Sequence, residues 1–202
     1  MVYRLLMLTY SEMLTLHDAA LADTTALVER AARGDLGIAT PCEGWDLADL
    51  LSHMIGQNLG FAAAVATGDA DEAAYAGPDV APANAVGQWD ASAEALRAAF
   101  GPADEAAVVR LAEFDIQVTP AVALSMQLLD TAVHAWDVAA ALGDTYRPDD
   151  AVTELVLDFA RQIASRPGGS PGVFGEPLAE TGADPWLDAL RLLGRDPRPV
   201  GA

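Results

Sequence analysis

The amino-acid sequence predicts an all-α fold, and three observations support that prediction. Ala, Leu, Glu and Asp dominate the long segments of the chain. Apolar residues recur along these segments at spacings of three and four, which is the period of a helix with one buried face. Alternating β-branched and aromatic residues, which are typical of strands, are scarce. Helix is therefore the default interpretation of each long segment.

The first three helices are each bounded by residues that start or stop a helix. They are expected at 11–33, 46–67 and 84–100. Gly34 ends the first helix, Asp46 caps the second, and Gly68 ends it. The segment 69–82 is rich in Asp, Ala, Gly and Pro, so we expect a surface loop there.

The second half of the chain contains three further helices after a short extended segment. They are expected at 119–142, 150–165 and 185–193. The helix at 119–142 is apolar on almost every face, which is typical of a buried central helix. Before it, 108–111 and 114–118 are candidates for a small hairpin or an extended crossing segment. We interpret 1–202 as a single domain, with a bundle core at about 10–166 and a C-terminal extension at 167–202 that combines an irregular tail with the last helix.

Charge excludes several classes of function. The 202 residues include 30 Asp and Glu against 11 Arg and no Lys, a formal net charge of −19. The Arg residues are scattered, so no basic stripe could follow a nucleic-acid backbone or an anionic membrane. We therefore expect no nucleic-acid and no membrane partner, and a small molecule as substrate.

The sequence also indicates a cytoplasmic protein. The single Cys42 excludes an internal disulfide framework. The apolar start at 1–10 is short and lacks a cleavage site, and no stretch reaches the length of a membrane span. Arg without Lys in an Ala-rich chain fits the codon bias of a GC-rich bacterial genome.

Candidate metal ligands lie in the apolar helix at 119–142. Asp130, His134 and Asp137 stand at i, i+4 and i+7, which places them on one face. A carboxylate and an imidazole one turn apart can close on one divalent ion. His53 also lies mid-helix among apolar residues. Among the 30 carboxylates, Asp130 is the one placed in an apolar helix one turn from a His.

Each of these residues also has a plainer interpretation. An Asp and a His at i and i+4 occur as simple ion pairs on helix faces, and a buried His is more often hydrogen-bonded than bound to a metal. The spacing alone does not decide between a metal site and the plainer interpretation. We interpret His17 as a surface or interhelical polar residue, Cys42 as structural, and Asp137 as a group that orients a ligating His.

Several segments together resemble the mycothiol-dependent maleylpyruvate isomerase and DinB-like superfamily of actinobacteria. The segment 40–53, Thr-Pro-Cys-Glu-Gly-Trp-Asp-Leu-Ala-Asp-Leu-Leu-Ser-His, resembles the pattern TPCxGWxxxDLxxH of those proteins. The segments 56–58, 133–139 (Val-His-Ala-Trp-Asp-Val-Ala) and 194–197 match in the same order. The matches extend from residue 40 to residue 197.

The resemblance implies a fold and a metal site. It implies a four-helix bundle in up-down-down-up order, with a long crossover between the second and third helices. It also implies a divalent metal, commonly zinc or nickel, with His53, Asp130 and His134 as ligands. A low-molecular-weight thiol such as mycothiol would be the second cofactor. Trp45, Met126 and Trp136 are candidates for the apolar wall of the pocket, and the oligomeric state is open between monomer and homodimer.

Two departures from the family pattern leave the function open between two classes. Asp130 stands where the isomerases carry Glu, and Ala140 replaces a familiar Arg. The leading hypothesis is a metal-dependent thiol transferase or isomerase that acts on a small electrophile. The alternative is a non-catalytic bundle with a structural or vestigial metal site.

Overall fold

A computed structural model describes residues 8–166 and 173–197. These residues divide into two compact units, one ending at Tyr146 and one beginning at Arg147. The boundary differs from the sequence expectation, which placed the end of the bundle core at about 166. The interpretation of 1–202 as a single domain stays a prediction. Residues 167–172, the first part of the irregular segment expected before the last helix, lie outside the described residues.

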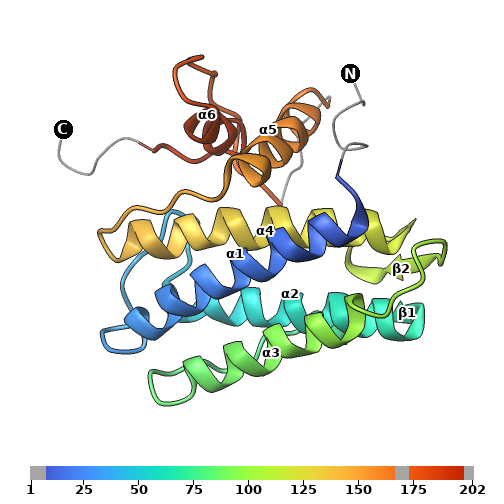
Figure 1. Ribbon diagram of the computed structural model, residues 1–202. Helices are drawn as coiled ribbons and strands as arrows, with labels where there is room; N and C mark the ends of the chain where they lie inside the picture. The colour runs from blue at the N-terminus through green and yellow to red at the C-terminus, as the bar shows by residue number, and fades with distance from the viewer. Residues whose placement is uncertain (1–7, 167–172, 198–202) are drawn as a thin grey trace. The chain divides into compact units, whose positions relative to one another are not determined.

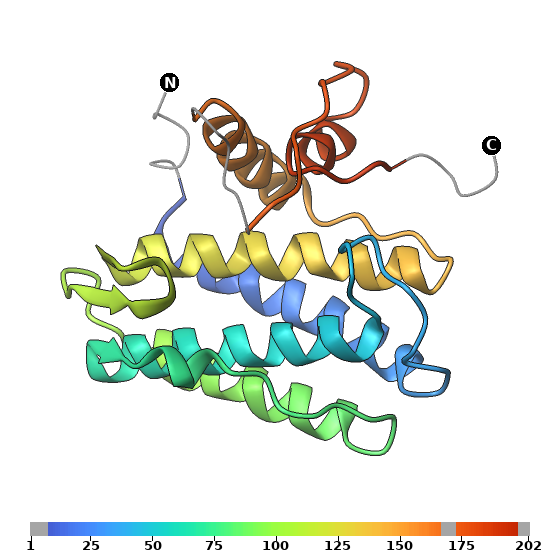
Figure 2. The same cartoon turned by 180° about the vertical axis from the view of Figure 1, so that it is seen from behind.

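The first unit is a bundle of four helices (Figure 1). The helices are α1 (Tyr10–Ala31), α2 (Leu47–Thr67), α3 (Ala85–Phe100) and α4 (Pro120–Ala141). In Figures 1 and 2, α1 and α4 run in one direction, while α2 and α3 run in the other. Helix α2 packs on α3 and α4, and α1 packs on the same two helices. The all-α bundle with up-down-down-up order is therefore confirmed.

The crossover between α2 and α3 carries the first strand of a small sheet. Strand β1 (Asp69–Ala70) pairs in parallel with β2 (Val109–Leu111), and β2 pairs antiparallel with β3 (Ile116–Val118). Short 3₁₀ helices η1 (Glu72–Tyr75) and η2 (Ala112–Phe114) complete these connections. The predicted hairpin is confirmed. The prediction of a loop over 69–82 is wrong at its start, because its first two residues form β1, which pairs with β2 as a third strand.

Close packing of the crossover on α2 depends on a glycine. Figure 2 shows the chain after η1 running back along α2. A Cβ atom at Gly60 would overlap the ring of Tyr75, so a side chain at that position would push η1 away from the helix. Ser52 donates a hydrogen bond to the carbonyl oxygen of Pro78 at 2.8 Å, which holds the later part of the crossover.

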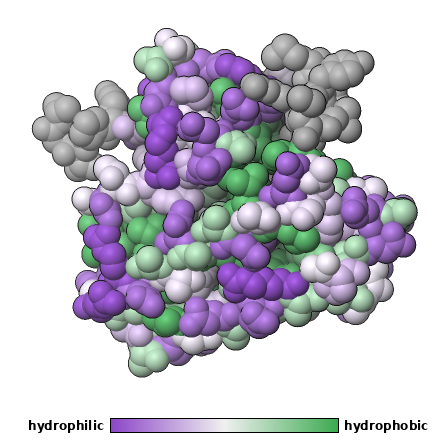
Figure 3. All heavy atoms as spheres, viewed as in Figure 1, coloured by the Kyte–Doolittle hydropathy of each residue, from purple (hydrophilic) through white to green (hydrophobic). Residues whose placement is uncertain are grey.

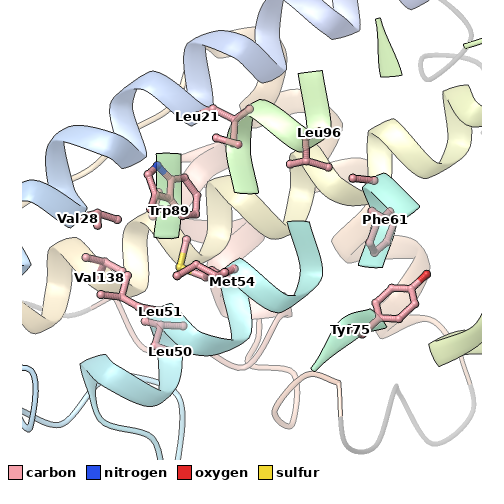
Figure 4. Packing of buried hydrophobic residues seen from close by; sticks show 14 of the residues in the cluster. Leu21, Val28, Leu50, Leu51, Met54, Phe61, Tyr75, Trp89, Leu96 and Val138 are labelled. Carbon is pink, nitrogen blue, oxygen red and sulfur yellow. The ribbon is translucent and has the colours of Figure 1, made fainter. Parts of the chain in front are cut away.

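The hydrophobic core lies between the four helices (Figure 4). Trp89 of α3 is fully buried there, and its indole N–H donates to the Thr25 hydroxyl at 2.9 Å. Leu21, Leu51 and Leu96 are also fully buried. At about 25 cal/mol per Å² of apolar surface, each of these leucines contributes about 2 kcal/mol to the free energy of folding.

The second unit contains α5 (Asp150–Ala164) and α6 (Pro185–Leu192), which pack on each other. Asp184 caps α6 and pairs with Arg147, at 2.7 Å between the nearest carboxylate oxygen and guanidinium nitrogen. Both helices lie within a residue of their expected bounds.

Many of the acidic residues lie on the surface. Seven of them, in loops and at the starts of short elements, are exposed: Asp69, Asp71, Glu72, Asp149, Asp150, Glu176 and Glu180. Figure 3 shows hydrophilic residues spread over one face of the molecule. None of the described helices is long and apolar enough to span a membrane.

Candidate metal centre

A tightly bonded loop before α2 positions the first part of the site. Residues 42–45 form a turn in which the Trp45 N–H donates to the Cys42 carbonyl at 3.0 Å. Gly44 occupies that turn at φ 82°, a conformation that favours glycine. The Thr40 hydroxyl donates to the Trp45 carbonyl at 2.9 Å. These bonds fix Cys42 and Trp45 at the start of α2.

Three potential ligands converge between α2 and α4. His53 comes from α2, whose start is fixed by a reciprocal capping box between Asp46 and Asp49. Asp130 Oδ1 lies 3.8 Å from His53 Nε2 and 3.5 Å from His134 Nε2. The two imidazole rings meet edge to face, with centroids 5.0 Å apart. The structure therefore brings together the three residues that the sequence nominated from two separate helices.

The spacing of these donors fits a divalent ion. Tetrahedral coordination at ordinary zinc–nitrogen and zinc–oxygen lengths places neighbouring donor atoms about 3.3 Å apart. The separations of 3.5 and 3.8 Å exceed that value by only a few tenths of an ångström. The shorter side chain of Asp130 therefore comes close to both imidazole nitrogens without a Glu. A metal held by these three residues would keep a fourth position for a water or a substrate.

Asp137 fixes the orientation of one ligand. Its carboxylate Oδ2 lies 2.9 Å from His134 Nδ1, and the carboxylate is fully buried. A carboxylate only accepts hydrogen bonds, so His134 donates from Nδ1 and keeps its Nε2 lone pair toward Asp130. This is the arrangement by which carboxylates orient metal-binding histidines, and the role of Asp137 in orienting a ligand stays a prediction.

Burial of the two aspartates differs from what the apolar helix pattern suggested. The side chains of His53 and Asp130 are about a quarter exposed, at 26% and 25%, whereas that of Asp137 is 0% exposed. Asp130 is therefore partly open to solvent. The carboxylate that is enclosed is Asp137, which lies against Cys42 of the loop before α2.

The three expected wall residues lie in different places. The Trp45 ring packs against His53, with centroids 4.8 Å apart. Met126 is partly buried against the core and lies one turn before Asp130 on the same face of α4. Trp136 lies two residues after His134, about 200° round the helix, so its side chain leaves from another face. Its place in the pocket wall stays a prediction.

Cys42 is a neighbour of the site that the sequence analysis interpreted as structural. Its thiol donates to Asp137 Oδ2 at 3.3 Å, and its Sγ lies 3.9 Å from His134 Nδ1. The spacing in the sequence gave no signal for this contact, because Cys42 and Asp137 are 95 residues apart. Its position directly before a helix in the Thr40–Trp45 segment was the nearest clue.

The remaining histidine lies outside the site. His17 of α1 is buried, and its ring meets Phe100 of α3 edge to face at 6.5 Å between centroids. Desolvation lowers the pKa of His17 to about 4, so the ring is neutral at pH 7. Its Nε2 has no hydrogen-bond partner. The sequence analysis left His17 open between a surface and an interhelical position. The interhelical position is confirmed, and the surface position is wrong.

The fold and the site define a helical-bundle protein with a candidate metal centre between α2 and α4. The sequence model of the mycothiol maleylpyruvate isomerase N-terminal domain family matches residues 17–139, and the chain belongs to that family. The resemblance seen in the sequence motifs is thereby confirmed.

Two solved structures share the fold. One is a mycothiol-dependent maleylpyruvate isomerase, at 18% identity, and the other is a histidine-to-alanine mutant of that isomerase, at 15% identity. Each aligns with a TM-score of 0.67 and covers 89% of this chain and 80% of the other. No curated protein sequence matches the chain.

Proposed function

We propose that this protein binds one divalent metal ion through His53, Asp130 and His134 and activates a low-molecular-weight thiol for reaction with a small electrophile. The observation that carries the proposal is the convergence of these three donors from two helices, with the third held in its ligating form by buried Asp137. Membership of the family supports mycothiol as the thiol and zinc or nickel as the metal.

Each residue of the site would have a separate role in such a reaction. When bound, the metal supplies a Lewis acid that lowers the pKa of a coordinated thiol. His53 and His134 donate neutral nitrogen ligands, and Asp130 adds one negative charge. Asp137 keeps the proton on His134 Nδ1. Trp45 lies against His53 and shields one side of the centre from water.

The exposure of the site supports a small substrate. About a quarter of the His53 and Asp130 side chains is open to solvent, so a ligand can reach the fourth coordination position. Trp45 and Met126 pack against the core and supply an apolar part of the neighbouring wall. An electrophile with an apolar body and one reactive carbon would fit that part. Maleylpyruvate is a dicarboxylate and does not follow from the apolar wall, but membership of the family supports testing it beside apolar electrophiles.

The test combines metal analysis with a reaction assay. Protein purified without chelator is analysed for metal, and thiol consumption is then measured with mycothiol and a panel of small electrophiles. We expect about one metal per chain and turnover that His53→Ala abolishes. Glutathione serves as the control thiol.

Three other outcomes would overturn the proposal. Metal binding without any turnover would favour the non-catalytic bundle, whose support is Ala140 in place of the family Arg. Marked loss of thermal stability on chelation, again without turnover, would identify the three ligands as a structural metal clip. No metal at purification and none on titration would remove the site altogether.

A further inference from the structure

A second set of metal donors shares His134 with the first. Cys42 Sγ, His134 Nδ1 and Asp137 Oδ2 form a triangle with sides of 2.9 Å between nitrogen and oxygen, 3.3 Å between sulfur and oxygen, and 3.9 Å between sulfur and nitrogen. Among the described residues, this triad and the triad of the candidate centre are the two groups with donors close enough to hold an ion. The imidazole ring of His134 separates the two groups, with one nitrogen facing each.

The triangle already has nearly the dimensions of a coordination site. With ordinary zinc–sulfur, zinc–nitrogen and zinc–oxygen lengths, tetrahedral geometry separates nitrogen from oxygen by about 3.3 Å and sulfur from either by about 3.6 Å. Each observed side lies within a few tenths of an ångström of these values. Small side-chain adjustments would therefore let all three atoms contact one ion.

Burial and donor type indicate which ion would bind. Asp137 is fully buried and His134 nearly so, whereas Cys42 lies on a loop and is partly exposed. An ion can reach the triad past Cys42. A thiolate favours soft or borderline ions such as Cd²⁺, Cu⁺ and Zn²⁺ over Mg²⁺ or Ca²⁺.

We propose that Cys42, His134 and Asp137 form a second metal site, selective for thiophilic ions, which competes with the first site for His134. A neutral imidazole has one nitrogen lone pair. An ion at Nδ1 therefore requires the ring proton to move to Nε2, and the first site then loses a ligand. The Cys42 thiol releases its proton to solvent as the metal–sulfur bond forms, and no electron transfer is involved.

Cadmium titration of the full chain tests the proposal. Metal-free protein is reduced with a phosphine, which is not itself a thiol, and titrated with Cd²⁺ while thiolate-to-cadmium charge-transfer absorption is followed in the ultraviolet. We expect a band that saturates at one equivalent per chain. Because the chain contains one cysteine, Cys42→Ser is the control that must lose the band.

The decisive variants change the other ligands. His53→Ala removes a ligand of the first site only. The charge-transfer band, and the cadmium affinity measured from it, should therefore stay as in the wild type. Asp137→Asn and His134→Ala should each weaken cadmium binding at Cys42 by about tenfold or more. An unchanged affinity in both of these variants would show that Cys42 binds cadmium without the triad, and the proposal would fail.

A spectroscopic measurement covers the case in which a variant does not fold. X-ray absorption of the wild type with one equivalent of Cd²⁺ should show one sulfur neighbour together with one imidazole. A first shell of nitrogen and oxygen alone would overturn the proposal and leave the triad as a hydrogen-bonded support of His134. If the wild type shows no cadmium–sulfur contact but still consumes mycothiol with an electrophile, only the second metal site fails. The proposed function then stands.

Discussion

The two antiparallel helix pairs of the bundle each bury a histidine, and the two environments differ sharply. Between α1 and α3, His17 lies against Phe100, and its Nε2 has no hydrogen-bond partner. Between α2 and α4, both ring nitrogens of His134 face a carboxylate, at 2.9 Å on one side and 3.5 Å on the other. Burial is similar, at 3% and 8% exposed.

The difference shows that burial alone does not place a histidine among potential metal donors. Desolvation keeps His17 neutral at pH 7, and its Nε2 has no hydrogen-bond partner. At His134, the carboxylate of Asp137 fixes the tautomer and directs the other nitrogen toward His53 and Asp130. Convergence of partners from a second helix distinguishes the two sites, and four changes would test that distinction.

The largest expected effect is the loss of metal when His134 is removed. His134→Ala takes away one of three ligands and should weaken zinc binding more than about 100-fold, beyond the range seen for residues that only orient a ligand. Calorimetric titration measures the affinity, with His17→Gln as the matched buried control. Equal losses of zinc affinity in His134→Ala and His17→Gln would show that the two histidines do not differ in metal binding.

Acid stability should depend on His17 in a defined direction. Its pKa is lowered from 6.5 to about 4 in the folded protein, so the unfolded chain binds the proton more readily. The stabilisation is present above pH 6.5 and is lost as the pH falls toward 4, by on the order of 3 kcal/mol. Urea unfolding at several pH values should show a shallower decline for His17→Gln. The same slope in both proteins would contradict this account of His17.

Replacing the buried carboxylate should have a smaller effect on the metal. Asp137→Asn keeps the shape of the side chain but removes the charge that fixes the His134 proton. We expect a loss of about 10- to 100-fold in zinc affinity at the first site, the range known for groups that orient a ligand. Competition with a chromophoric chelator measures it. A zinc affinity equal to that of the wild type in Asp137→Asn would show that His134 needs no orienting partner.

The smallest effect is expected at Asp130. Its oxygen already lies 3.5 and 3.8 Å from the two imidazole nitrogens, close to the separation that coordination requires. Asp130→Glu adds one methylene and should change zinc affinity by less than about tenfold, which competition with the same chelator can measure. A gain of 100-fold or more would show that the shorter side chain impairs the site.

Local sequence determined the helices and the face on which the ligands of α4 lie. The Asp46 cap and the Gly68 stop define α2, and Thr119 followed by Pro120 begins α4. Asp130, His134 and Asp137 share a face because a helix repeats every 3.6 residues. These features depend on near neighbours in the chain, so the sequence was sufficient to predict them. The hairpin of β2 and β3 was one of two interpretations of its segment, and the structure decided between them.

Only the tertiary structure decided which residues from distant segments meet. Periodicity has no information on the distance between His53 and Asp130, or on the approach of Cys42 to Asp137, since both depend on how α2 and its preceding loop pack on α4. The same packing left Asp130 partly open and enclosed Asp137. The sequence by itself determined the helices and the candidate ligands of α4, while the packing of the bundle decided that His53 meets Asp130 and that Cys42 meets Asp137, because these pairs come from distant segments.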